Sequence, residues 1–117
     1  MREPVRDKGR LLHILEAISK VQDYTREVET KEALDGDPMR KHATTYNIQI
    51  IGEAIYKLTS EFKANHPNTP WRMIEKSRHI LLHDYYQVNI DILWSIIQED
   101  MAPLKAQIEE YLKEFDS

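Results

Sequence analysis

Apolar residues recur at steps of three and four along most of this chain, and this spacing most limits its fold. The first run holds Leu11, Ile14, Leu15, Ile18, Val21 and Tyr24. The second holds Met39, Ala43, Tyr46, Ile50, Ile51, Ala54, Ile55, Leu58 and Phe62. The last holds Ile90, Leu93, Trp94, Ile97, Met101, Leu104, Ile108 and Leu112. Such spacing is typical of amphipathic helices, so the sequence predicts an all-α protein.

Turn and capping residues place the boundaries of the first two helices. After a polar and frayed start over residues 1 to 8, we expect a helix over residues 10 to 31, because no turn signal interrupts it. Asp37 can cap the second helix, and Pro38 fits its first turn. The second apolar stripe then continues as far as Phe62.

Prolines and asparagines separate the remaining helices. Residues 64 to 70 are a loop, and we expect a third helix over residues 70 to 86, capped by Thr69. Asn89 can cap the last helix. Pro103 interrupts that helix, so a kink or a break is expected there, because proline lacks a backbone donor and crowds the preceding turn.

Length and composition restrict the architecture and the location. A chain of 117 residues supports one helical domain over residues 1–117, a four- or five-helix up-and-down bundle. It has no cysteine, which excludes disulfides and thiolate metal sites and fits a cytoplasmic protein. It also lacks an apolar run long enough for a membrane span or an export signal. The formal net charge of -4 argues against a general nucleic-acid coat, so any RNA contact should be local.

The stretch from Thr69 to Asn89 reverses this acidic character. It carries Arg72, Lys76, Arg78, His79, His83, Tyr85 and Tyr86. Arginine presents a permanent cationic fork that suits phosphate, and histidine can move protons near neutral pH. Arg78 and His83 are therefore candidates for acid–base chemistry on a phosphodiester. They lie roughly 140° apart around a helix, so a shared site needs either a long reach by the arginine or a dimer that brings two copies together.

The polar residues of this region also have ordinary structural explanations. His79 and His83 have the spacing of a metal-chelating pair, but no third ligand is marked, so no metal site is expected. Asp84 could orient an imidazole in trans or through the backbone. Glu53, on the second helix, could support an active-site arginine or simply face solvent. His66, in the loop, is expected to be exposed.

Residues 78 to 85, Arg-His-Ile-Leu-Leu-His-Asp-Tyr, resemble the Arg-x4-His-x-Tyr motif of the HepT-like toxins, a branch of the HEPN ribonuclease superfamily. Three further segments are similar to that family in the same order and spacing, at 51 to 58, 70 to 74 and 88 to 97. With the leucine-rich start at 10 to 24, the resemblance covers nearly the whole chain.

The resemblance implies a homodimer that cuts RNA at a shared cleft, without a metal or cofactor. In that scheme Arg78 holds the scissile phosphate and stabilises its developing charge. His83 acts as general base or acid for attack by the 2′-hydroxyl or for the leaving oxygen. His79 stands where the family commonly has asparagine, so the chain keeps a polar residue there but departs from the usual motif.

The resemblance also implies a partner, a small nucleotidyltransferase antitoxin of the MntA type that adds AMP to the motif tyrosine, here Tyr85. An AMP group beside Arg78 would occupy the same cationic pocket and block it. A second hypothesis belongs to another class: a catalytically idle helical adaptor whose cationic patch docks the nucleotidyltransferase or its nucleotide. The negative net charge suits that hypothesis as well.

Overall fold

The chain folds into helices joined by short turns. The computed structural model describes residues 2–76 and 88–115. Its elements are α1 (Arg2–Thr25), α2 (Lys31–Asp35), α3 (Pro38–Lys57), α4 (Ser60–Asn65), helical residues 71–76, α6 (Ile90–Ser95), a π-helical turn (Ile96–Asp100), α7 (Met101–Leu112) and a 3-10 turn (Lys113–Phe115). None of the residues in the two described ranges lies in a strand, which confirms the all-α prediction.

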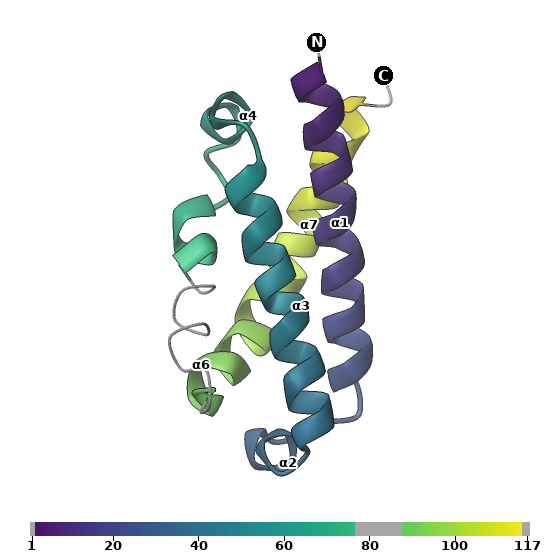
Figure 1. Cartoon of the computed structure of the whole chain (residues 1–117), viewed down its shortest axis with the longest axis vertical. Coiled ribbons are helices and arrows are strands. Elements are labelled where there is room, and N and C mark those ends of the chain that lie inside the picture. Colours follow the sequence, from purple (N-terminus) through teal and green to yellow (C-terminus); the bar gives the residue numbers. More distant parts are fainter. Residues whose placement is uncertain (1, 77–87, 116–117) are drawn as a thin grey trace.

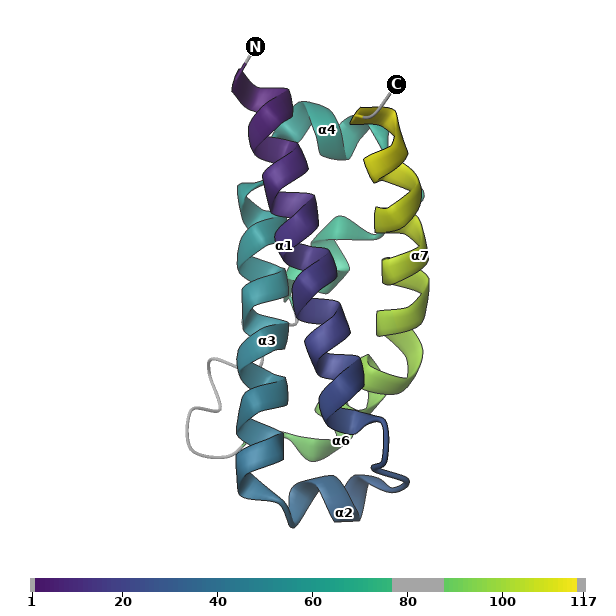
Figure 2. The same cartoon turned by 90° about the vertical axis from the view of Figure 1, so that its right-hand side faces the viewer.

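The long helices run alternately up and down the molecule. α1 descends from the N-terminus and α3 returns beside it (Figure 1). Figure 2 shows α1 between α3 and α7, with α2 and α6 at one end. The other end holds α4 and both chain ends. This arrangement is the predicted up-and-down bundle, with residues 71–76 as the first part of its third arm.

The core lies where α1, α3 and α7 face one another. Its fully covered side chains include Leu11, Ile14, Ile18, Val21, Ile51, Ile55, Leu93, Met101, Leu104 and Ile108. Burial of each such side chain contributes about 1.5–3 kcal/mol to folding, so the periodic stripes stabilise the bundle as the sequence predicts. Within the described ranges, no helix has both the length and the apolar character needed to cross a membrane.

The first helix is longer at its start and shorter at its end than the sequence predicts. It begins at Arg2, and Asp7, far from frayed, is buried and accepts hydrogen bonds from the Thr59 amide at 2.9 Å and the Thr59 hydroxyl at 2.7 Å. The helix ends at Thr25, whose hydroxyl donates back to the Val21 carbonyl at 2.8 Å. Thr30 then caps α2 by accepting from the Ala33 amide.

The second predicted helix is divided in two. Asp37 caps α3 by accepting from the Arg40 amide, and proline occupies the first turn, as predicted. The helix ends at Lys57 instead of continuing to Phe62. Thr59 caps a new helix, α4, by accepting from the Phe62 amide at 3.1 Å.

Two residues of the predicted second apolar stripe face outward. Met39 is 82% exposed and Tyr46 is 64% exposed. On either side of Tyr46, the polar side chains of Thr45 and Asn47 are buried, and their hydrogen bonds stay within the helix. Thr45 donates to the Lys41 carbonyl and Asn47 to the Ala43 carbonyl. Because these groups are satisfied, they can be buried at little cost, and the apolar stripe is narrower than predicted.

The predicted interruption near Pro103 takes the form of a change in helix type. The π-helical turn at Ile96–Asp100 directly precedes α7, so Pro103 falls in the first turn of that helix. Because Pro103 cannot donate a hydrogen bond to the carbonyl four residues earlier, the regular α-helical pattern cannot continue there, and the change of helix type lies in the turn just before it. The helical path nevertheless continues without a break.

Candidate active site

The predicted site residues of the motif lie outside the described residues: Arg78, His79, His83, Asp84 and Tyr85. Their positions and roles remain predictions. The structure describes the residues on both sides of the motif segment, namely the lead-in (residues 69–76) before it and the start of α6 after it. Glu53, the remaining predicted site residue, is described.

The lead-in is fixed to the last helix by Thr69. Its side chain is 2% exposed, and its hydroxyl donates to Gln107 Oε1 at 2.8 Å and lies 2.6 Å from the Tyr111 hydroxyl. The prediction that Thr69 caps the third helix is therefore wrong, because its hydroxyl is engaged by α7 instead of a helical amide. The helical residues begin at Trp71, whose indole N–H donates to the His66 carbonyl at 2.9 Å.

Rings pack around the lead-in as an aromatic cluster formed by Phe62, His66, Trp71, Tyr111 and Phe115. The His66 ring stacks on Phe62 with centroids 4.0 Å apart and lies 4.5 Å from Tyr111. Its Nδ1–H donates to the Phe62 carbonyl at 2.7 Å. The histidine side chain is only 13% exposed, so the prediction of an exposed loop histidine is wrong: the residue is part of the packing that holds the lead-in.

After the motif segment, the described chain resumes and α6 begins with a capped first turn. The Asn89 side chain accepts from the amides of Asp91 and Ile92 at 3.0 and 3.1 Å, which confirms the predicted cap. Asp91 also receives a 2.6 Å hydrogen bond from Lys31 of α2. This hydrogen bond and the carboxylate charge raise the pKa of Lys31 above its ordinary 10.5. Both sides of the motif are thus joined to well-defined helices.

A shallow cleft lies between the lead-in and α7. Its lining consists of Pro70, Met73, Ile74, Glu99, Asp100, Pro103, Leu104 and Gln107. Partial burial, with a smaller contribution from the charge of Glu99, raises the pKa of the Asp100 carboxyl above its ordinary 3.8. Since both acidic side chains would repel an anion, this cleft is a poor place for a phosphate.

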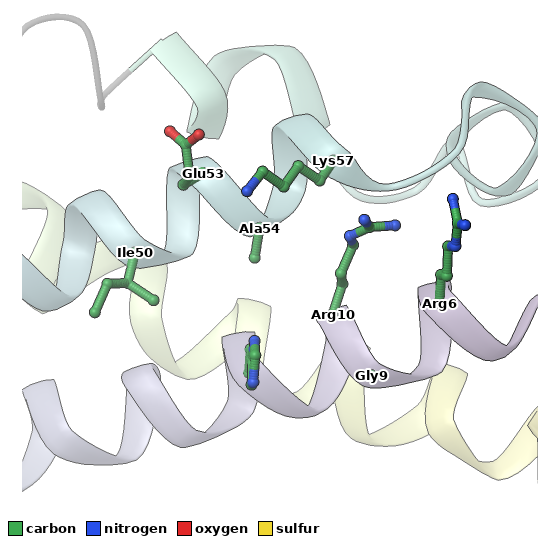
Figure 3. A pocket seen from close by; sticks show the side chains of 8 residues that line it. Arg6, Gly9, Arg10, Ile50, Glu53, Ala54 and Lys57 are labelled. Carbon is green, nitrogen blue, oxygen red and sulfur yellow. The ribbon is translucent and has the colours of Figure 1, made fainter. Parts of the chain in front are cut away.

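Glu53 lies on the rim of an open groove between α1 and α3, which encloses about 450 Å³. The lining residues are Arg6, Gly9, Arg10, His13, Ile50, Glu53, Ala54 and Lys57. In Figure 3, Arg6 and Arg10 extend from α1 toward α3, whereas Glu53 points away from α1. The supporting role predicted for Glu53 involves the motif arginine and remains a prediction.

Sequence reasoning missed the cations of this groove. Arg6, Arg10 and His13 are spaced by four and three residues, which places them on one face of a helix. That signal is present in the sequence, but the expectation of a frayed start conceals it. Within residues 2–76 and 88–115, no group of three His, Cys, Asp or Glu side chains has an arrangement that could hold a metal ion.

Comparison with known proteins identifies relatives over nearly the full chain. The family described as "Ribonuclease HepT-like" matches residues 14–111. A protein of Thermococcus cleftensis named "Probable ribonuclease HepT" is 35% identical over 91% of this chain and 96% of its own length. A protein of Methanocaldococcus jannaschii named "Putative RNase MJ1380" is 31% identical over 87% of this chain and 93% of its own. No solved structure gives a significant match.

Proposed function

The chain belongs to the ribonuclease HepT-like family of the HEPN superfamily, and from this membership we propose that it is a metal-independent endoribonuclease toxin. The observation that carries the proposal is the family match over residues 14–111, which includes Arg78 and His83 at the spacing of the family motif. The names of two relatives, both ribonucleases, support RNA as the substrate.

The proposed reaction is an in-line transfer within RNA. Arg78 holds a non-bridging oxygen of the scissile phosphate and stabilises the charge that grows on it. One His83 imidazole accepts the proton of the 2′-hydroxyl as its oxygen bonds to phosphorus. The bond from phosphorus to the 5′-oxygen breaks, and that oxygen takes a proton from a second His83 in its cationic form. The products are a 2′,3′-cyclic phosphate and a 5′-hydroxyl.

The two-histidine scheme needs a homodimer. Arg78 and His83 diverge by roughly 140° around a single helix, so one copy does not bring them to a shared site. Two copies of the motif facing each other would bring an arginine and two histidines into one cleft. The bonds on both sides of the motif fix the flanking residues of each copy within its own bundle. Thr69 and Asn89, on the two sides of the motif, have their side chains bonded within the bundle. Cleavage should therefore disappear when the protein is diluted below its dimer dissociation constant.

The cleavage test uses purified protein, freed of any partner, and a labelled RNA in the presence of EDTA. Wild type should produce fragments ending in a cyclic phosphate. His83→Ala should stop cleavage, because the proton carrier is absent, and leave the helical circular dichroism unchanged. Lys113→Ala is a matched surface control on the C-terminal turn, and it should cleave like wild type. RNA that stays intact with wild type, or cleavage that survives in His83→Ala, contradicts the proposal.

We propose further that a nucleotidyltransferase antitoxin inactivates the protein by adding AMP to Tyr85. The added phosphodiester would lie two residues from His83 and compete for the cation at Arg78. Mass spectrometry of protein co-expressed with such a transferase should show AMP on a peptide containing Tyr85. Tyr85→Phe should lose this modification and remain toxic. A modified peptide that lacks Tyr85 would contradict the assignment.

The net charge of -4 favours one alternative, a non-catalytic adaptor that docks the nucleotidyltransferase. RNA would be repelled by most of such a surface, whereas a basic protein would not. The adaptor is the better explanation if wild type and His83→Ala both leave RNA intact and both bind the transferase with equal affinity.

A further inference from the structure

The α1–α3 groove is a local inversion of charge in an acidic protein. Arg6 and Arg10 stand on one wall and Lys57 on the other, opposed by the single carboxylate of Glu53, which points away from α1 (Figure 3). The chain as a whole has a net charge of -4. Arg6 and Glu53 each have an interaction partner, so the positive charge that an anion would meet here comes mainly from Arg10 and Lys57.

Two of these cations lack any partner within the described residues. In those ranges, Arg10 and Lys57 make no hydrogen bond or ion pair, although other surface cations do, such as Arg26 with Asp23 and Lys41 with Asp35. Arg10 is half-buried, so its guanidinium donors lie beside the groove while their bonding capacity is unused. Arg10 therefore offers donors in a fork that matches phosphate.

Gly9 forms the floor of the groove and, having no side chain, leaves open space above it. This glycine lies inside α1, where glycine costs about 1 kcal/mol relative to alanine. Packing does not require it, since a Cβ added at this position would meet no atom within 4 Å. The open space above Gly9 permits the close approach of a ligand between Arg6 and Arg10.

The groove continues along α1 as an extended track. A second hollow shares His13 and Ile50 with the first and is also lined by Lys20, which pairs with Glu16 of the same lining at 3.4 Å. Arg6, Arg10, His13 and Lys20 lie on one face of α1 and span a length of about 21 Å at 1.5 Å per residue. That length exceeds a mononucleotide and suits several consecutive phosphates of an extended strand.

The lining is suited to a backbone, not to bases. Among the described residues that line the groove there is no Phe, Tyr or Trp on which a base could stack. Stacking on aromatic rings is the usual means of holding bases of a single strand. A ligand here is therefore recognised through charge and phosphate oxygens, with little dependence on sequence.

From these observations we infer that the α1–α3 groove is a phosphate-binding track for single-stranded RNA, with Arg10 and Lys57 as its principal contacts and Gly9 as its floor. This inference rests on the proposed ribonuclease function, since it gives the substrate a binding surface beyond the motif. In this role the groove holds the strand outside the cleavage site and raises affinity without choosing the bond that breaks.

The test measures binding separately from cleavage. The probe is a fluorescent single-stranded oligonucleotide with 2′-O-methyl groups at every position, which cannot undergo attack by the 2′-oxygen. Its anisotropy is followed against protein concentration at several salt concentrations. Arg10→Glu and Lys57→Glu should each weaken binding by about tenfold at low salt. Lys57→Ala should lower the slope of log affinity against log salt by about 0.7, because the variant neutralises one phosphate fewer.

The matched control is Arg26→Glu, which makes the same charge change just beyond the far end of α1, at a residue paired with Asp23. It should alter binding less than twofold. Gly9→Leu fills the floor without changing charge, and it should weaken binding while the helical content is kept. Equal losses of affinity in Arg10→Glu and Arg26→Glu would show a general charge effect and overturn the inference.

Two other outcomes also overturn it. One is a wild type that does not bind the oligonucleotide at low salt. The other is that Arg10→Glu and Lys57→Glu lose binding to an acidic partner protein while their affinity for the oligonucleotide stays that of wild type. Failure of the nuclease proposal looks different, because RNA with free 2′-hydroxyls would stay intact while the binding differences among the variants persisted.

Discussion

The α1–α3 groove and the lead-in are opposite kinds of surface within one small bundle. In the lead-in, Thr69 is 2% exposed and bonded twice, and Trp71 is 7% exposed and bonded to a carbonyl. In the groove, Arg10 and Lys57 have no bonding partner among the described residues. The difference teaches that side chains with satisfied bonds fix the lead-in to the bundle, whereas Arg10 and Lys57 keep unused bonding capacity at the surface.

The largest effect should come from removing the indole at the centre of the lead-in. Trp71→Ala should lower the free energy of unfolding by about 3–5 kcal/mol, because it leaves a cavity among packed rings. Trp71→Phe should be less destabilising, since only the bond to the His66 carbonyl and part of the ring are gone. Urea unfolding followed by circular dichroism measures both. If the alanine variant loses less than about 1 kcal/mol, the packing of the lead-in does not stabilise the fold more than the groove does.

A smaller decrease in stability is expected when only the hydroxyl of Thr69 is removed. Thr69→Val keeps the shape but leaves Gln107 and Tyr111 without their shared partner. The cost of an unsatisfied buried polar group is about 1–3 kcal/mol. Thr69→Ser retains the hydroxyl and should stay closer to wild type in the same urea measurement. Equal stability of the valine and serine variants would mean that the two bonds do not hold the lead-in.

In the groove, a substitution should raise the free energy of unfolding instead of lowering it. Gly9→Ala should raise the free energy of unfolding by about 0.5–1 kcal/mol, because alanine favours the helix and the added methyl meets no atom. Thermal unfolding would show this as a higher midpoint. If Gly9→Ala is less stable than wild type, the glycine is needed for the packing of α1. The groove would then contribute to stability as the lead-in does.

The smallest effect concerns pH at the cleft beside the lead-in. The pKa of Asp100 is raised above 3.8, so the folded protein holds this proton more tightly than the unfolded chain. Its contribution to stability therefore increases as pH falls from the raised pKa toward 3.8. Asp100→Asn should flatten this part of the stability profile from urea titrations between about pH 7 and pH 4.

Local patterns predict the helical stripes and two of the caps. Asp37 and Asn89 cap their helices as expected, because both act on amides two or three residues away. Leu11 and Ile108 are fully buried, as their periodicity indicates. Each of these properties depends on neighbours along one helix, so a single sequence is enough to find them.

Two of the incorrect predictions depend on distant partners, whereas the local caps at Thr30 and Thr59 were readable from the sequence. A frayed start is wrong for Asp7 because its carboxylate bonds to Thr59, 52 residues away. A helix cap is wrong for Thr69 because its hydroxyl bonds to residues 38 and 42 positions later. Periodicity carries no information about such pairs. The α1 wall of the groove has a local signal in the spacing of Arg6, Arg10 and His13, but its pairing with α3 is not readable from periodicity.

The bonds of Thr69 also determine when the lead-in can be fastened during synthesis. Its partners Gln107 and Tyr111 are translated long after the motif has left the ribosome's catalytic centre. Until α7 emerges from the exit tunnel, a nascent chain contains Arg78 and His83 but lacks the helix that fastens the segment leading to them. Synthesis order thus delays the fastening of the lead-in until nearly all of the polypeptide exists.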